Sequence, residues 1–278
     1  MDDSGRSMAS DELGDFVDLR RYPLTDPAAF APQLADCRKQ LQSSSFVRLP
    51  GFLRPGVAAR MASEILAALP KAYRREKTFS AYAEDPLSDS RLPEAHARRR
   101  RHLNRQYVVT ADVLPPTGMV ATLYNDDVLT ATIAKILNEP ALYRLADPIL
   151  SYAGTVMADG DTHGWHFDLN DFVVSILLQA PDAGGTFDFA PNIRSDQDEN
   201  YAEVAAVMDG KSTAARSVAV EAGTLLVFCG RRALHRVPPV VGPTPRVIAL
   251  FSYDRVPGVT YSSDVYMRVV GRPGPVRP

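Results

Sequence analysis

The chain contains 278 residues, of which 45% are hydrophobic and 23% charged, and its 31 basic and 33 acidic residues leave a formal net charge of −2. This balance gives no overall positive charge of the kind with which many proteins bind nucleic acids or membrane surfaces. A transmembrane helix is excluded because no run of about 18 apolar residues occurs, and Cys37 and Cys229 are too few for a disulfide framework.

The amino-terminal residues 1–15 are polar and small, which predicts a disordered tail. The start Met1-Asp2-Asp3 lacks the basic and apolar regions of a signal peptide, so we expect a cytoplasmic protein. Residues 16–278 are expected to form a single domain, with helices and loops over about 16–140 and a β-core over about 141–270.

The next segments predict helices around one short strand. Residues 27–42 and 55–69 carry apolar side chains at helical spacing, and prolines bound the second of these segments. Between them, residues 46–50 have the composition of a short strand that enters a turn. Residues 120–137 predict a further helix or a pair of helices.

Residues 74–106 are polar, contain proline and show little periodicity, which predicts a long loop. If this loop lies at the mouth of a site, Asn104 and Arg105 become candidate ligand contacts. The run Arg98-Arg99-Arg100-Arg101-His102 could bind nucleic acid or phosphate, but the acidic residues just upstream favour a solvated loop instead.

The second half of the chain predicts strands. Residues 170–179 are rich in β-branched and aromatic residues, Gly184-Gly185 interrupts the run, and residues 186–189 alternate polar with apolar. These stretches are typical of successive antiparallel strands. Residues 221–228 then predict a turn and an apolar strand that leads to His235.

His166-Phe167-Asp168 has the spacing of two metal ligands on one strand. Residues i and i+2 of a pleated strand point to the same side, so His166 and Asp168 can converge while Phe167 faces away. Two imidazoles and one carboxylate hold iron(II) and leave coordination positions open. With His235 they form a candidate open iron site, although a His-x-Asp tripeptide also occurs by chance around an ordinary hydrogen-bonded histidine.

Arg246 lies in the apolar segment 245–252, where a buried arginine calls for an anion. A guanidinium presents a rigid fork of donors that matches a carboxylate, so Arg246 could hold the far carboxylate of 2-oxoglutarate. The alternative is an arginine that ends the strand and pairs with a nearby acidic side chain.

These segments resemble the iron(II)/2-oxoglutarate-dependent dioxygenases over about residues 145–255. More narrowly they resemble the branch of bacterial free-amino-acid halogenases and their hydroxylase relatives. The motifs that carry the resemblance are Trp165-His166-Phe167-Asp168, Gly184-Gly185-Thr186-Phe187, Gly223-Thr224-Leu225 and Leu234-His235-Arg236-Val237. The resemblance implies an α+β, mainly β fold with a double-stranded β-helix (jelly-roll, cupin-like) core buttressed by amino-terminal helices.

The same resemblance implies roles for individual residues. His166, Asp168 and His235 would bind Fe(II), and Arg246 would bind 2-oxoglutarate. Halogenating members have glycine in place of the aspartate, so Asp168 implies a hydroxylase. His163 matches a histidine beside the metal ligands of this branch.

Substrate contacts are expected from His163, Arg105 and Asn170. Lysine-type members of the branch carry an acidic residue directly after the position of Asp168, where this chain has Leu169. A basic amino acid is therefore a less secure substrate, unless Asp171 or Asp147 approaches the pocket from elsewhere.

We therefore expect an oxidoreductase that uses Fe(II), 2-oxoglutarate and O2 to hydroxylate an unactivated C–H bond of a small molecule, with release of succinate and CO2. The expected substrate is an amino acid or an amino-acid derivative. Desaturation, cyclisation or epimerisation in a natural-product pathway is an open alternative, as is a jelly-roll that binds a ligand without turnover. We expect neither a nucleic-acid nor a membrane partner, and a homo-oligomer remains an open question.

Overall fold

The computed structural model describes residues 12–82 and 90–275. Its main element is one 11-stranded sheet in which every pairing is antiparallel. The strands are β1 (Phe46–Leu49), β2 (Tyr73–Phe79), β3 (His102–Thr110), β5 (Tyr152–Met157), β6 (Thr162–His166), β7 (Val173–Gln179), β9 (Phe187–Ala190), β10 (Arg216–Val218), β11 (Thr224–Phe228), β12 (Leu234–Val237) and β14 (Arg246–Phe251).

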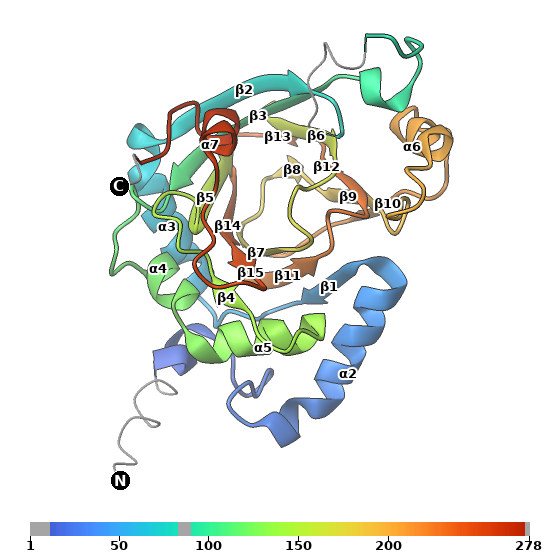
Figure 1. The fold of residues 1–278 in the computed structure, drawn as a ribbon. Coiled ribbons are helices and arrows are strands. Elements are labelled where there is room, and N and C mark those ends of the chain that lie inside the picture. Colours follow the sequence, from blue (N-terminus) through green and yellow to red (C-terminus); the bar gives the residue numbers. More distant parts are fainter. Residues whose placement is uncertain (1–11, 83–89, 276–278) are drawn as a thin grey trace.

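The sheet curls because β3 belongs to both of its halves. The end of β3 pairs with β5, whereas its beginning pairs with β6, and β2 adds to the edge of β3. The spatial order is β1-β11-β7-β14-β5-β3-β6-β12-β9-β10. The result is the double-stranded β-helix that the sequence predicts, and Figure 1 shows its two halves facing one another.

Two short ladders and several helices complete the chain. β8 (Ala183–Gly184) pairs with β13 (Val240–Val241), and β4 (Tyr143–Arg144) pairs with β15 (Tyr253–Asp254). The helices are α2 (Pro27–Ser44), α3 (Val57–Ala68), α4 (Met119–Tyr124), α5 (Asp127–Leu137), α6 (Tyr201–Met208) and α7 (Ser263–Val269), with 3-10 turns η1 (Leu69–Lys71) and η2 (Ala97–Arg99). None of the described helices combines the length and hydrophobicity that crossing a membrane requires.

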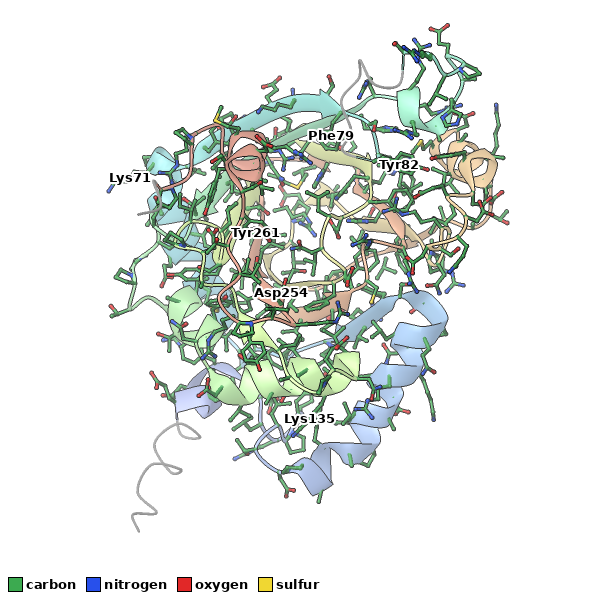
Figure 2. The ribbon with its side chains drawn as sticks, viewed as in Figure 1. Lys71, Phe79, Tyr82, Lys135, Asp254 and Tyr261 are labelled. Atoms are coloured by element: carbon green, nitrogen blue, oxygen red, sulfur yellow. The ribbon has the colours of Figure 1, made fainter. Side chains whose placement is uncertain are left out.

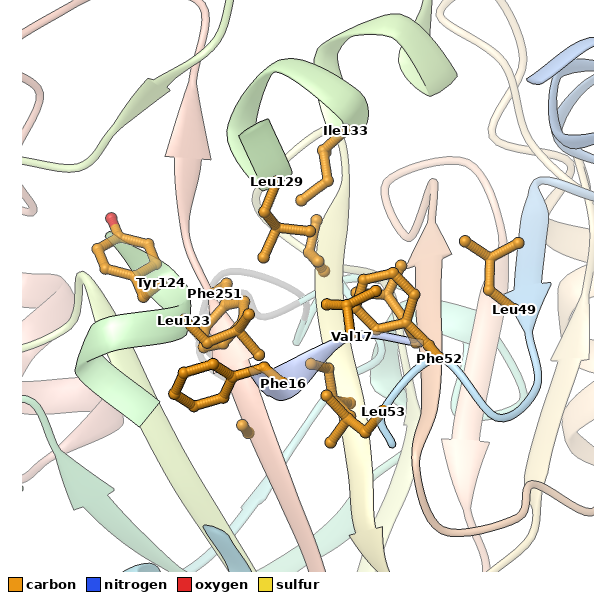
Figure 3. Close-up of a cluster of buried hydrophobic side chains, with 14 of the residues drawn as sticks. Phe16, Val17, Leu49, Phe52, Leu53, Leu123, Tyr124, Leu129, Ile133 and Phe251 are labelled. Atoms are coloured by element: carbon orange, nitrogen blue, oxygen red, sulfur yellow. The ribbon is translucent and has the colours of Figure 1, made fainter. Parts of the chain in front are cut away.

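The main hydrophobic core lies between the sheet and the amino-terminal helices. Its apolar side chains come from α3, α4 and α5 and from one face of β1, β3, β5, β7, β11 and β14, and Figure 3 shows part of it around Phe52, Leu123 and Ile133. Gly154 of β5 allows the close approach of α3, because a Cβ there would lie 2.6 Å from Ile65 Cγ2. The helices thus buttress one face of the sheet and leave its other face to line the interior.

The predicted helices and most of the predicted strands are confirmed, including the helical pair α4 and α5. β7 and β9 are both strands, but they lie in different parts of the sheet and do not pair with one another. Residues 1–11 of the predicted tail lie outside the described residues. Residues 12–16 are helical and Leu13 is buried, so the prediction of disorder is wrong for residues 12–15.

The predicted long loop over residues 74–106 is wrong at both of its ends. Residues 74–79 belong to β2 and residues 102–106 belong to β3, and the two strands pair over their whole common length. The sheet therefore begins well before residue 141. The alternation was hidden because polar side chains occupy both faces of this ribbon, where Arg74 pairs with Asp161 on one face and Asn104 is buried on the other.

Candidate metal centre

His166, Asp168 and His235 come together at one end of the curled sheet. His166 ends β6 and lies directly opposite His235 of β12 in the antiparallel register, and Asp168 follows β6 by two residues. The Nε2 atom of His166 lies 3.7 Å from Asp168 Oδ1, and that of His235 lies 3.4 Å from Asp168 Oδ2. One donor atom from each residue lies within 4.8 Å of the others, which is a grouping that can hold a metal ion.

Backbone carbonyls orient both imidazoles. His166 Nδ1 lies 2.8 Å from the Gly164 carbonyl oxygen, and His235 Nδ1 lies 3.0 Å from that of Ala233. A carbonyl oxygen can only accept, so each Nδ1 carries the proton and each Nε2 presents its lone pair to the centre. This is the usual way in which a protein fixes the tautomer of a metal-binding histidine.

The protonation states also suit a cation. Burial lowers the pKa of His166 well below its ordinary value, and the neighbouring His163 and His235 act in the same direction, so the imidazole stays neutral. Burial acts to raise the pKa of Asp168, but its interactions with the adjacent His235 and His166 side chains outweigh burial and lower that pKa. Neutral imidazoles with an ionised carboxylate are the donor set that iron(II) requires.

Asp168 supplies a further test of whether a metal fits. Its Oδ2 atom is buried and has no hydrogen-bond partner among the described residues. A buried carboxylate oxygen without a donor costs free energy unless a cation approaches it. The residues present therefore fit a divalent metal ion between the two Nε2 atoms and the carboxylate.

Aromatic rings surround the histidines of the centre. The ring of Phe228 meets that of His235 edge-on, with 4.6 Å between centroids, and Phe187 lies on another side of His235. Phe79, labelled in Figure 2 at the end of β2, contacts both His163 and His166 edge-on. Phe167 faces away as the alternation predicts, and the Arg194 guanidinium covers its ring at 3.8 Å.

Arg246, the predicted 2-oxoglutarate residue, begins β14 and is 5% exposed. Its Nε donates to the Gly185 carbonyl oxygen at 3.0 Å, and burial lowers its pKa to about 10. Within the described part of the chain it forms no ion pair with an acidic side chain, and its charge helps to lower the pKa of His163. This leaves a buried cation that an anionic ligand would neutralise.

His163 lies directly beside the predicted metal ligand His166. Its ring stacks on that of His166 with 3.7 Å between centroids and 11° between planes. Burial lowers its pKa well below the ordinary value, and the charge of Arg75 is the next largest cause. A neutral imidazole at this place can donate one hydrogen bond and accept another.

Arg75 and Phe79 are site residues that sequence reasoning missed. Arg75 lies over the Phe79 ring at 5.6 Å, and its Nε is buried without a hydrogen-bond partner in the described structure. Burial lowers its pKa to about 10. The available signal was the period-two spacing of Tyr73, Arg75 and Phe79, which places all three on one face of a strand.

The other predicted substrate contacts have different surroundings. Arg105 binds Asp161 at 3.0 Å and the Gly160 carbonyl oxygen at 2.6 Å, which directs its side chain away from the triad. Asn170 donates to the Tyr261 hydroxyl at 2.9 Å. Asn104 lies opposite His163, is fully buried, and has no partner for either amide atom among the described residues. The roles of Arg105 and Asn170 in substrate binding stay predictions.

Asp147 and Asp171, the acidic residues considered in place of an acidic side chain at position 169, both have partners. Asp147 accepts hydrogen bonds from the backbone N–H groups of Ile149, Leu150 and Tyr261 and from the Tyr266 hydroxyl. Asp171 pairs with Arg231 and Arg255. Leu169 itself is 53% exposed. Neither carboxylate is left without a partner for a positively charged ligand.

Within the arginine run, Arg99 donates to the Leu92 carbonyl oxygen and Arg100 pairs with Asp209 of the loop after α6. His102 at its end has a buried Nε2 without a partner in the described residues. Burial, with Arg100 and Arg236, lowers its pKa to about 4.

This pKa predicts a loss of stability in acid. Between a pH of about 6.5, the ordinary histidine pKa, and the folded value of about 4, the unfolded chain binds a proton at His102 that the folded chain does not. Stability should therefore fall as the pH drops through this window. In thermal melts at several pH values, His102→Gln should show a shallower fall than the unaltered chain. Equal slopes would contradict the prediction.

Comparison with known proteins places this geometry in a family. The model of a family described as Halogenase D matches residues 30–262. No curated protein matches the chain.

Solved structures share the fold at low sequence identity. A 2OG-Fe(II) oxygenase family oxidoreductase from Burkholderia pseudomallei is 19% identical, with a TM-score of 0.50 over 81% of this chain and 92% of that one. AviO1 from Streptomyces viridochromogenes Tue57 is 18% identical, with a TM-score of 0.52 over 79% and 93%. The non-heme alpha ketoglutarate dependent carbocyclase SnoK is 12% identical, with a TM-score of 0.52 over 87% and 93%.

Proposed function

The chain belongs to the Halogenase D family, within the iron(II)/2-oxoglutarate oxygenase superfamily, and from that premise we propose that it hydroxylates a small amino acid or amino-acid derivative. The observation that carries the proposal is the carboxylate of Asp168, which faces both histidines of the centre. A carboxylate there would provide the third protein ligand and would leave no place for the halide that a halogenase binds. The residues thus favour hydroxylation over the halogenation that the family description suggests.

Iron(II) and 2-oxoglutarate, when bound, supply the oxidising chemistry that inserts an oxygen atom into an inert C–H bond. The balanced reaction takes substrate, 2-oxoglutarate and O2 to hydroxylated substrate, succinate and CO2. In this reaction His166, Asp168 and His235 would hold the metal, and Arg246, whose Nε donates to the Gly185 carbonyl oxygen, would bind the far carboxylate of 2-oxoglutarate through its other guanidinium N–H groups. Phe79, Phe187 and Phe228 exclude water around the ligands.

The substrate class follows from the charges of the interior. Arg75 is a cation beside His163 without an acidic partner in the described chain, which suits the carboxylate of an amino acid. Asp147 and Asp171 are both engaged by other groups, so neither of these carboxylates is free to bind a basic side chain. We therefore propose an amino acid, or a derivative that keeps the carboxylate, whose side chain carries no positive charge.

A screen for succinate formation tests the proposal directly. The iron-loaded protein is incubated with 2-oxoglutarate, O2 and single free amino acids, and product masses are recorded with and without added chloride. Addition of one oxygen atom to a neutral amino acid, unaffected by chloride, is the expected result. A chlorinated product would support halogenation instead, and loss of two hydrogens or an unchanged product mass would point to desaturation, cyclisation or epimerisation.

Arg75→Gln is expected to raise the KM for the amino acid by about 10- to 100-fold, because hydrogen bonds to a charged group contribute about 1.5–3 kcal/mol. The substrate would also be held less firmly, so more succinate should form per hydroxylated product. Steady-state kinetics with separate assays for succinate and product measure both effects. Arg60→Gln, on an exposed position of α3, serves as the control. An unchanged KM in Arg75→Gln would remove Arg75 from the substrate site.

A further inference from the structure

Gly230 lies against the carboxylate of Asp168 although the two residues are far apart in the sequence. It is buried in the turn between β11 and β12, and its carbonyl oxygen accepts a hydrogen bond from the Asp168 backbone N–H at 3.1 Å. A Cβ atom at position 230 would lie 1.7 Å from Asp168 Oδ2, 2.6 Å from its Cγ and 3.0 Å from its Cβ. There is no room for any side chain at position 230 while the carboxylate stays in place.

Rotation of the carboxylate alone does not relieve this contact. Turning the carboxyl group about the Cβ–Cγ bond moves the oxygens, but Cγ remains 2.6 Å from the new atom. Only a turn about the Cα–Cβ bond moves Cγ, and that turn takes the oxygens away from the positions in which they face the Nε2 atoms of His166 and His235. A side chain at position 230 and a metal-binding carboxylate at position 168 therefore exclude one another.

The glycine is not required by the backbone of its turn. Gly230 is absent from the positive-φ glycines of the described chain, so its φ angle does not call for glycine. The turn is held by two other hydrogen bonds, from the Cys229 N–H to the Ser45 carbonyl oxygen at 2.8 Å and from the Arg232 N–H to the Cys229 carbonyl oxygen at 3.3 Å. The contact with Asp168 thus explains why position 230 is a glycine.

We propose that Gly230 is a positioning residue for the metal centre and that Asp168 and Gly230 together determine whether a carboxylate from this chain binds the metal. The absence of a side chain at position 230 admits the carboxylate to the metal. This inference rests on the proposed function in one respect, namely that Asp168 binds the metal. It adds that residue 230 must be glycine if the carboxylate at position 168 is to bind the metal.

The test is a double-mutant cycle with Gly230→Ala, Asp168→Gly and the double variant. Affinity for iron(II) is measured by anaerobic titration calorimetry, and the melting temperature is measured without metal. Gly230→Ala should weaken metal binding by about 10- to 100-fold, the usual effect of disturbing a group that orients a ligand, and should lower the melting temperature. In the Asp168→Gly background the same alanine should change neither quantity, because its clash partner is gone.

Gly14→Ala is the matched control, because Gly14 also has no positive φ and a Cβ there would meet only Leu19 Cδ1 at 3.5 Å. Its metal affinity should equal that of the unaltered chain. Equal losses of metal affinity and melting temperature from Gly230→Ala in both backgrounds would overturn the proposal, because the glycine would then be needed by the turn itself. The absence of a loss in either background would overturn it as well. A chain that binds no metal would defeat the proposed function, while the melting-temperature cycle would still decide the contact between Gly230 and Asp168.

Discussion

His166→Ala is expected to abolish substrate-dependent succinate formation and to weaken iron(II) binding by more than the roughly 10- to 100-fold that loss of an outer-shell partner causes. The imidazole presents its Nε2 to the centre because its Nδ1 is held by the Gly164 carbonyl oxygen. Alanine removes this donor and leaves the carboxylate of Asp168 facing only His235. Iron(II) titration under anaerobic conditions, together with a succinate assay, measures both losses.

The control for this variant is His96→Ala. His96 accepts a hydrogen bond from the Arg98 N–H and contacts the Tyr201 ring, and it is not part of the metal-binding group. It should keep both metal affinity and turnover. Full turnover in His166→Ala with an intact fold by circular dichroism would refute the assignment of the centre.

Arg246→Met is expected to produce the second largest effect, a rise of about 30-fold or more in the KM for 2-oxoglutarate. Truncating one partner of a buried, hydrogen-bonded charge pair costs about 2–5 kcal/mol, and Arg246 is a buried cation without an acidic partner in the described chain. The KM for the amino acid should change much less, because Arg75 is the residue proposed to meet that substrate.

The same variant should be at least as stable as the unaltered chain when no ligand is bound. A buried charge without a counter-ion carries a desolvation cost that methionine, an unbranched and uncharged side chain, does not have. We therefore expect Arg246→Met to have an equal or higher melting temperature alone, but to lose the stabilisation that added 2-oxoglutarate gives the unaltered protein. Arg48→Met, an exposed arginine on β1, is the control. If 2-oxoglutarate raised the melting temperature of Arg246→Met as much as that of the unaltered chain, Arg246 would not bind the co-substrate.

The residues of the candidate metal centre could be predicted from sequence because each lies in a short segment with a recognisable pattern. The period of two in a strand places His166 and Asp168 on one side within three residues, and apolar strands before His235 and around Arg246 indicate that these residues lie in the sheet. The helices α2, α3 and α5 were equally accessible, since their apolar spacing repeats over several turns. In each case the deciding pattern lies within one continuous segment.

The ribbon of β2 and β3 was not accessible in this way. Its polar residues lie on both faces, so no alternation marks it as a strand, and only pairing with β5 and β6 makes it part of the sheet. The register then decides which polar residues turn inward. Arg105 is directed to Asp161, whereas Arg75 lies over Phe79 beside the metal ligands.

The amino-acid sequence by itself thus determined which side chains form the candidate metal centre, because each of them lies in a short segment with a recognisable pattern. Only the tertiary structure decided which buried arginines have no acidic partner among the described residues. It also decided that Asp147 already accepts hydrogen bonds and that Gly230 lies against Asp168. These facts depend on contacts between segments far apart in the chain. Such contacts form when the sheet curls, and no local pattern of residues specifies them.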